Sequence, residues 1–220
     1  MVHQKRLSAP KHYAIDRKGL TYTTTTEGSR SPEQGIPAVI FLREVTGYAE
    51  TKKEAKEIIR NGVLFRNGDR IRNIRDTIGV MDVIEIEETE ETFRMLPESE
   101  GLVFQETSDN RSAAKVTGKT VEGDEYVYHL HNGENYRTED EYSTGATLVF
   151  NGDVEAFQIE EEGEVVILGG KHAGKVAEVK ELHSRGMRPD TATVETQESE
   201  FEIMQDKLFA KGDLEVVSNE

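Results

Sequence analysis

The sequence has no cysteine and no tryptophan among its 220 residues, and only five prolines. The absence of cysteine excludes disulfides, thiolate-bound zinc and thiol catalysis. No apolar run approaches the 18 or so residues that a membrane-spanning helix needs, and the opening Met-Val-His-Gln-Lys-Arg lacks the apolar stretch of a signal peptide. We therefore expect a cytoplasmic chain with no membrane partner.

Apolar residues are few as well, at 35% against 32% charged residues. This composition still permits folding, and with 19 glycines it favours small β-rich modules over one large α/β core. The length allows one or two domains. We expect an α+β fold that is mostly β.

Basic residues are scarce overall, since the formal net charge is −16, but they are unevenly distributed. Residues 1–80 hold 15 Lys and Arg against 9 Asp and Glu, whereas residues 81–220 hold 12 against 34. Such a division indicates a nucleic-acid-binding face in the first third of the chain. The acidic residues elsewhere are spread through predicted strands and turns alike, which favours adaptation of the whole surface to molar salt over an acidic interaction surface.

Residues 1–35 show no sustained apolar periodicity but carry five basic residues within the first twenty, namely Lys5, Arg6, Lys11, Arg17 and Lys18. This pattern predicts an extended basic arm rather than a domain. A frayed terminus without a function would give the same pattern.

Two helices and a hairpin are predicted next. Pro37 suits a first helical turn, and the helix it begins runs to about Glu44. Thr51-Lys-Lys-Glu54 reads as a capping box, which starts a second helix that ends at Asn61-Gly62. The Asn67-Gly68 pair predicts a tight hairpin turn, and a strand is expected over Val80–Ile86.

The second predicted helix is basic on one side. Lys52, Lys56 and Arg60 are spaced i, i+4 and i+8, so they form one stripe, with Lys53 beside it and Ala55, Ile58 and Ile59 on the opposite face. The stripe suits a phosphate backbone, although most lysine-rich helix faces are simply solvated. It can be extended by arginines of the first helix and the hairpin region, namely Arg43, Arg66, Arg70, Arg72 and Arg75.

This stretch resembles the alpha-L RNA-binding domain of ribosomal and RNA-modifying proteins, in which the second helix and the hairpin contact RNA. The resemblance is carried by the two helices, Ile58-Ile-Arg-Asn-Gly-Val-Leu-Phe-Arg-Asn-Gly-Asp-Arg-Ile71 and the strand after it. It implies an RNA-binding domain over residues 36–91.

Only strands are predicted beyond residue 92, at regular spacing between Gly and Asn turns. We expect two small β domains, a central one over residues 92–162 and a C-terminal one over residues 163–220.

The loop from Gly169 to Val176 permits two interpretations. It nearly matches the phosphate-binding pattern G-x-x-x-x-G-K-[ST], but Val176 stands where a hydroxyl should bind Mg²⁺ and no helix signal follows. Gly170-Lys-His-Ala-Gly174-Lys-Val176-Ala-Glu-Val179 instead resembles the KOW motif of ribosomal proteins and elongation factors. That resemblance implies an SH3-like barrel, with RNA contacts at Lys171, His172 and Lys175.

No residue pattern supports a metal, a cofactor or catalysis. His129 and His131 alternate along one strand, yet no third ligand can be argued, so surface or RNA-facing imidazoles are favoured over a metal pair. No known nucleophile, zinc or EF-hand pattern is present. We expect neither a cofactor nor a small-molecule substrate.

The whole chain resembles the archaeal and eukaryotic type of small-subunit ribosomal protein four. The likeness rests on the order of the modules and on Ala9-Pro-Lys-His12, Val39-Ile-Phe-Leu-Arg43, Gly79-Val-Met-Asp-Val-Ile84 and His131-Asn-Gly-Glu-Asn-Tyr136. It implies a structural, non-enzymatic component of the small ribosomal subunit, with rRNA and neighbouring ribosomal proteins as partners. An RNA-modifying or translation-associated factor that uses the alpha-L domain as a tether is the alternative, and a nucleotide hydrolase is a third reading.

The charge pattern and the resemblances together give the candidate RNA contacts. They are Lys5, Arg6, Lys11, His12, Arg17, Lys18, Arg43, Thr51, Lys52, Lys53, Lys56, Arg60, Arg66, Arg70, Arg72, Arg75, Lys171, His172 and Lys175.

Overall fold

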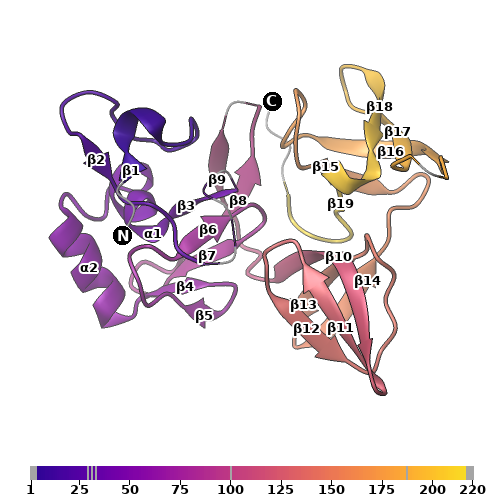
Figure 1. Cartoon of the computed structure of the whole chain (residues 1–220), viewed down its shortest axis with the longest axis horizontal. Coiled ribbons are helices and arrows are strands. Elements are labelled where there is room, and N and C mark those ends of the chain that lie inside the picture. The colour runs from indigo at the N-terminus through magenta and orange to yellow at the C-terminus, as the bar shows by residue number, and fades with distance from the viewer. Residues whose placement is uncertain are drawn as a thin grey trace. The chain divides into compact units, whose positions relative to one another are not determined.

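The structure is a computed structural model that describes residues 4–28, 30, 32, 34–99, 101–186 and 188–216. The two ends of the chain, where the arm and the C-terminal domain were expected to begin and finish, lie outside the described residues. The fold is mostly β, with short helices and antiparallel sheets, as the composition predicted (Figure 1). The chain forms two compact units, the first of residues 1–96 and 100–110 and the second of residues 97–99 and 111–220.

The N-terminal segment is folded, which corrects the expectation of an extended arm. Strand β1 (Gln4–Lys5) pairs antiparallel with β2 (Tyr22–Thr23), and a 3₁₀ turn follows β1 at Arg6–Ser8. Ala9 and Tyr13 are buried in the core of the first unit. These two apolar side chains anchor the segment, although their spacing is too irregular to predict an element.

The two predicted helices are present. Strand β3 (Gly35–Pro37) leads into α1 (Ala38–Ile40), which continues as a π-helical turn over Phe41–Val45. Helix α2 (Lys52–Asn61) begins at the predicted capping box and ends at Gly62, whose φ of 84° is the left-handed conformation that favours glycine. Strand β6 (Thr77–Gly79) pairs with β3.

A five-stranded sheet completes the first unit. Its order is β5 (Asp69–Arg70), β4 (Leu64–Arg66), β7 (Val83–Ile86), β8 (Glu91–Pro97) and β9 (Leu102–Glu106). The predicted Asn67-Gly68 turn joins β4 to β5. Strand β7 begins later than predicted because Met81 has a φ of 66°, which interrupts the extended backbone. Because β8 and β9 extend this sheet, the sheet continues beyond residue 91, where the sequence placed the end of the domain.

The second unit contains two further five-stranded antiparallel sheets. The central sheet has the order β12 (Asn135–Thr138), β11 (Glu125–Leu130), β10 (Ser112–Glu122), β13 (Thr147–Asn151) and β14 (Asp153–Phe157). Its core is formed around Val116, Tyr128 and Leu148. Apolar runs predict a strand over Ala114–Val116 but none over Asn135–Thr138, so β10 is longer than predicted and β12 was not predicted.

The C-terminal sheet has the order β18 (Glu200–Met204), β17 (Thr191–Glu195), β16 (Val176–His183), β15 (Glu164–Ile167) and β19 (Leu208–Ala210). Val165, Val179 and Val194 lie in its core. A 3₁₀ turn at Gln205–Lys207 precedes β19, which the sequence analysis missed. Among the described residues, no helix has both the length and the apolar character of a membrane span.

Candidate nucleic-acid interface

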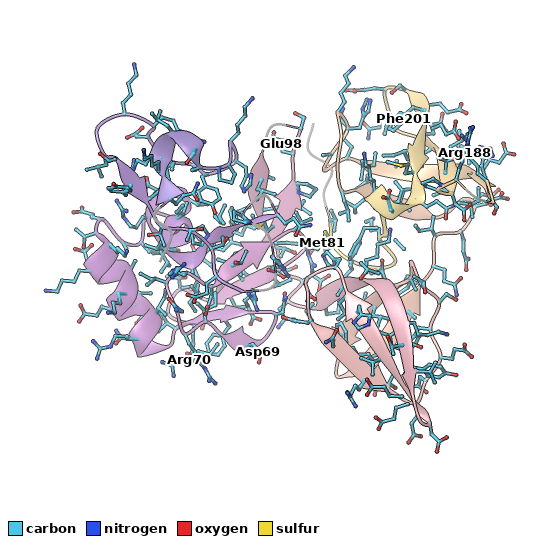
Figure 2. The ribbon with its side chains drawn as sticks, in the orientation of Figure 1. Asp69, Arg70, Met81, Glu98, Arg188 and Phe201 are labelled. Atoms are coloured by element: carbon cyan, nitrogen blue, oxygen red, sulfur yellow. The ribbon has the colours of Figure 1, made fainter. Side chains whose placement is uncertain are left out.

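Helix α2 presents a cationic face to solvent. The side chains of Lys52, Lys53, Lys56 and Arg60 are exposed, and within the described part of the chain none of them forms a hydrogen bond or an ion pair. Ala55 and Ile59 are buried on the opposite side. Figure 2 shows side chains with nitrogen tips projecting from the outer side of this helix. The predicted basic stripe therefore exists, and its charges are available to a partner.

The capping box determines where this helix begins. The Thr51 hydroxyl accepts from the Glu54 backbone N–H at 3.2 Å, and Glu54 Oε2 accepts from the backbone N–H of Thr51 at 3.2 Å and of Glu50 at 2.9 Å. These backbone hydrogen bonds lower the pKa of Glu54. Thr51, a candidate RNA contact, therefore also has a structural role.

Arg70 completes the other end of α2. Its Nη2 donates to the backbone carbonyl of Arg60 at 2.8 Å, which satisfies one of the free carbonyls of the last turn. The guanidinium occupies the space beside Gly62, since a Cβ added there would lie 2.0 Å from Cζ of Arg70. The hairpin thus fixes the helix through one of the predicted RNA-binding arginines, labelled in Figure 2.

Three of the other predicted arginines also make contacts within the first unit. Arg66 Nη1 donates to the Thr77 carbonyl at 2.6 Å. Arg75 pairs with Glu27 at 3.5 Å, and Arg43 pairs with Glu44 at 3.5 Å. Arg72 differs, because it is exposed and its side chain has no partner among the described residues. Most of the predicted arginines therefore position the module, and Arg72 remains available to a partner.

The basic residues of the N-terminal segment also fall into two groups, those bonded within the segment and those exposed to solvent. Arg6 is only 7% exposed and donates to the Asp16 carbonyl at 2.6 Å, so this candidate RNA contact is engaged within the segment. Arg17 donates to the carbonyls of Arg6, Ala9 and Pro10 at 2.7–2.8 Å. The side chains without such partners among the described residues are those of Lys5, Lys11 and Lys18, all of which are exposed. The remaining candidate, His12, is half-buried with Nε2 3.1 Å from the Gly35 carbonyl.

The loop between β15 and β16 forms a glycine turn. Gly174 has a φ of 82°, and its N–H donates to the Ile167 carbonyl at 2.8 Å. Strand β16 follows the loop directly, and a phosphate-binding loop would need a helix there, so the nucleotide-hydrolase reading is not supported.

Two of the three predicted contacts of this loop are engaged within the second unit. Lys175 pairs with Glu198 at 2.6 Å, and this hydrogen bond lowers the pKa of Glu198. The His172 ring stacks on Phe201 with centroids 4.3 Å apart. Lys171 is exposed, and no side-chain partner is found for it among the described residues.

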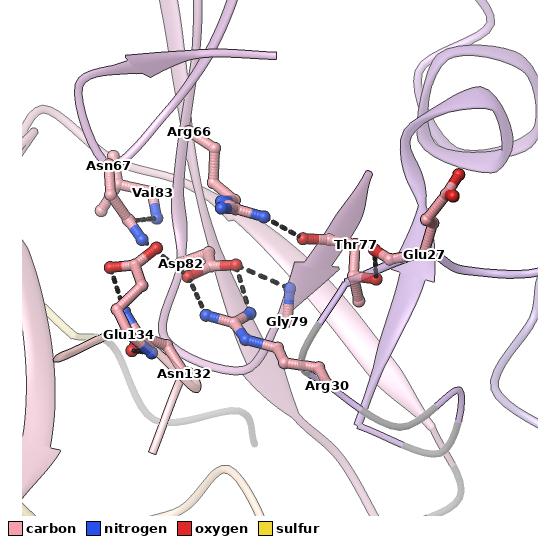
Figure 3. Close-up of polar contacts among 10 residues, drawn as sticks. All are labelled: Glu27, Arg30, Arg66, Asn67, Thr77, Gly79, Asp82, Val83, Asn132 and Glu134. Atoms are coloured by element: carbon pink, nitrogen blue, oxygen red, sulfur yellow. Dashed lines mark hydrogen bonds and ion pairs between the residues drawn. The ribbon is translucent and has the colours of Figure 1, made fainter. Parts of the chain in front are cut away.

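A buried ion pair that the sequence analysis missed organises the turns of the first unit. Asp82, 2% exposed, receives a bidentate contact from Arg30. It also accepts from Asn67 Nδ2 and from the Gly79 N–H, both at 2.8 Å (Figure 3). Burial alone would raise the pKa of Asp82, but the charge and hydrogen bonds of Arg30 lower it overall. Arg30 and Asp82 are 52 residues apart, so no local pattern could have revealed the pair.

A second missed residue is Lys115 on β10. Burial lowers its pKa to about 8, and its Nζ donates to the carbonyls of Gln205, Asp206 and Leu208 at 2.6–3.0 Å. It thereby joins the central sheet to the segment before β19.

The two alternating histidines have protein partners. His129 lies 2.8 Å from Asn135 Oδ1, and His131 Nδ1 accepts from the Lys115 N–H at 3.1 Å. Within the described ranges, no three His, Asp or Glu side chains are grouped so that they could hold a metal ion.

Known proteins share this architecture and part of this sequence. No protein-family model matches the chain. The fold is that of a ribosomal S4e protein, since the crystal structure of the 30S ribosomal protein S4e from Thermoplasma acidophilum matches with a TM-score of 0.66 at 21% identity, over 80% of this chain and 94% of that one.

Curated sequences are similar over nearly the full length. Small ribosomal subunit protein eS4 of Natronomonas pharaonis is 34% identical over 191 residues, which is 82% of this chain and 81% of the relative. The same protein of Methanosphaera stadtmanae is 33% identical over 221 residues, which is 96% of this chain and 92% of the relative. The chain therefore belongs to the family of small ribosomal subunit protein eS4, which confirms the resemblance seen in the sequence.

Proposed function

We propose that the chain is a non-catalytic, structural component of the small subunit of the cytoplasmic ribosome, where it binds rRNA chiefly through the cationic face of α2. Neighbouring small-subunit proteins are its other partners. The observation that carries the rRNA contact is the set of four exposed cations, without partners in the described part of the chain, on one side of a helix whose two ends are fixed by side-chain contacts. Membership of the eS4 family favours this role over that of an RNA-modifying factor.

The geometry of α2 supports a phosphate contact. Lys52, Lys56 and Arg60 recur every four residues, so their stripe extends about 12 Å along the helix axis at 1.5 Å per residue. Cations at such intervals can meet successive phosphates of one strand and release their counterions. Arg72, whose side chain also lacks a partner among the described residues, adds a cation near the hairpin.

The modules of the chain have different roles in this proposed rRNA binding. The helices and the sheet from β4 to β9 form an alpha-L-type RNA-binding module that extends to Glu106. The C-terminal sheet with its Gly174 turn is a KOW-type barrel, and Lys171 is its most accessible candidate contact. The central sheet lies between these two modules in the chain.

The test is rRNA binding by the full chain as a function of KCl concentration. A helix variant carries Lys52→Gln, Lys56→Gln and Arg60→Gln. The matched control replaces three lysines that already pair with carboxylates, Lys119→Gln, Lys180→Gln and Lys211→Gln, so that the net charge changes equally. We expect the helix variant to bind more weakly and to make the dependence of log K on log salt shallower by about 2–3.

The control should keep the slope of the unaltered chain. The helix variant should also sediment with small subunits less than the control does. Equal affinity and equal slopes for the helix variant and the unaltered chain would contradict the proposed role of α2.

A further inference from the structure

The N-terminal hairpin exposes large apolar side chains. Among the described residues, six large hydrophobic side chains are exposed, and three of them lie in this segment. Leu7 is 81% exposed, Leu20 64% and Tyr22 55%. Single exposed apolar residues need no explanation, but three within sixteen positions indicate a contact surface.

These three side chains lie where the β1–β2 ladder ends. In the β1–β2 register Lys5 opposes Tyr22, and the ladder continues through the hydrogen bond from Arg6 N to Thr21 O at 3.0 Å. Leu7 follows Arg6 in the 3₁₀ turn and Leu20 precedes Thr21, so both lie just beyond this last hydrogen bond of the ladder. Arg6, between Lys5 and Leu7, is buried, whereas Leu7, Leu20 and Tyr22 are exposed.

Hydrogen bonds and buried side chains fix the backbone of the N-terminal hairpin. Arg6 and Arg17 together donate to the carbonyls of Asp16, Arg6, Ala9 and Pro10 at 2.6–2.8 Å, and Ala9 and Tyr13 are buried. A surface fixed in this way loses little conformational freedom when it binds. The exposed face therefore resembles a preorganised platform rather than a loose terminus.

The charges around this face are mainly positive. Residues 4–26 contain five basic residues and one acidic residue, Asp16. Lys5 is the cross-strand partner of Tyr22, and Lys18 precedes Leu20 by two residues. Both lysines are exposed, and their side chains have no partner in the described ranges. An aromatic ring and apolar side chains between lysines suit a nucleic-acid strand whose bases are unpaired.

We propose that the face formed by Leu7, Leu20 and Tyr22, called the hairpin platform, packs against unpaired nucleobases of the small-subunit rRNA, while Lys5 and Lys18 meet the adjoining phosphates. The inference rests on the proposed function and adds a second contact of different chemistry. The size of the platform favours RNA over a protein, because a stable protein interface takes about 800 Å² and 20–30 residues from each partner. Three side chains are enough for one or two bases.

The experiment uses the full chain and small-subunit rRNA transcribed from the same genome. A platform variant carries Leu7→Ser, Leu20→Ser and Tyr22→Ser, and the control carries Val121→Ser, which replaces a 61% exposed apolar side chain of the second unit. Affinity is measured across a KCl series, and 2′-hydroxyl acylation maps the protected nucleotides. Loss of one stacked base weakens binding roughly fivefold to 150-fold.

We expect the platform variant to lose at least fivefold in affinity at every salt concentration with an unchanged salt slope, because the lost contacts are uncharged. A small set of nucleotides should become reactive, distinct from those exposed by the helix variant. Tyr22→Ser against Tyr22→Phe provides a second comparison that leaves the fold intact, and Phe should retain the affinity. Equal melting temperatures of these chains confirm that folding is unaffected.

Unchanged affinity and protections in the platform variant would overturn the inference while leaving the proposed function in place. Normal rRNA binding combined with poor entry into small subunits would also overturn it, because a neighbouring protein would then cover the platform. If the unaltered chain failed to bind the rRNA, the proposed function itself would be overturned, and the inference with it.

Discussion

Replacing Asp82 with alanine should strongly destabilise the first unit. The carboxylate is buried and accepts hydrogen bonds from Arg30, from Asn67 Nδ2 and from the Gly79 N–H. Asp82→Ala leaves the buried Arg30 guanidinium without its bidentate partner and removes the acceptor of two further donors.

The expected cost follows from the burial of the pair. Breaking a buried ion pair by removing one partner costs about 3–5 kcal/mol, since an uncompensated charge remains. The free energy of unfolding of a whole domain is only about 5–15 kcal/mol. In a unit of roughly 100 residues, each 1 kcal/mol lowers the melting temperature by about 4 °C or more. We therefore expect a decrease of at least about 12 °C.

The assay is thermal and urea unfolding of the full chain, with attention to the transition of the unit that contains Asp82. Glu122→Ala is the control, because its partner Arg137 and Glu122 itself are more than half exposed and such pairs contribute little. Arg30→Met combined with Asp82→Ala should recover part of the loss, since no charge then remains buried. A loss for Asp82→Ala no larger than that of the control would refute the reasoning.

The same pair predicts a pH dependence. The pKa of Asp82 is lower in the folded protein than the ordinary value of 3.8. The unfolded state therefore binds the proton more tightly, so the stabilisation is fully present above about pH 4 and is lost as the pH falls further. Asp82→Ala should flatten the acid limb of stability against pH, measured by urea unfolding between about pH 2 and pH 6.

Three further changes can be tested by unfolding of the full chain. Thr51→Ala removes the acceptor of the capping box and should cost about 1 kcal/mol, whereas Thr51→Ser should cost less. Gly174→Val places a β-branched residue at a φ of 82° and should destabilise the second unit by about 1–3 kcal/mol; an unchanged melting temperature would contradict the strained turn. Lys115→Met leaves the carbonyls of Gln205, Asp206 and the buried Leu208 without their donor and should lower stability by more than Lys180→Met, which alters an exposed lysine.

Local signals in the sequence were sufficient for the two helices and the hairpin of the first unit. The capping box at Thr51–Glu54 and the Asn67-Gly68 turn were predicted correctly because each depends on hydrogen bonds or φ angles within four residues. The amphipathic pattern of α2 likewise fixed which side would be cationic. Strand positions in the second unit followed from apolar runs between turns, although the polar strand β12 carried no such signal.

Contacts between residues far apart in the sequence could not be predicted from such local signals. Whether β8 pairs with β7 or begins a new domain depends on contacts that the two strands make only in the fold. The Arg30–Asp82 pair and the three carbonyls of Lys115 join residues 52 to 93 positions apart. In each case the sequence shows a charged residue in an apolar context, and the partner that makes its burial tolerable lies too far away to be identified.

The same limit explains why arginines and lysines differ in their surroundings among the candidate RNA contacts. A guanidinium has five donors in a planar fork, so it can satisfy several backbone carbonyls at once, as Arg17 does, or close a helix, as Arg70 does. A lysine ammonium is strongly hydrated and tends to remain outside. Of the cationic candidates, those whose side chains lack a partner among the described residues are seven lysines and two arginines, namely Lys5, Lys11, Lys18, Lys52, Lys53, Lys56, Arg60, Arg72 and Lys171. Because a free cation contributes to counterion release and an internally bonded arginine contributes to shape, the salt dependence of rRNA binding should follow the lysines, whereas the stability of the binding surface should follow the arginines.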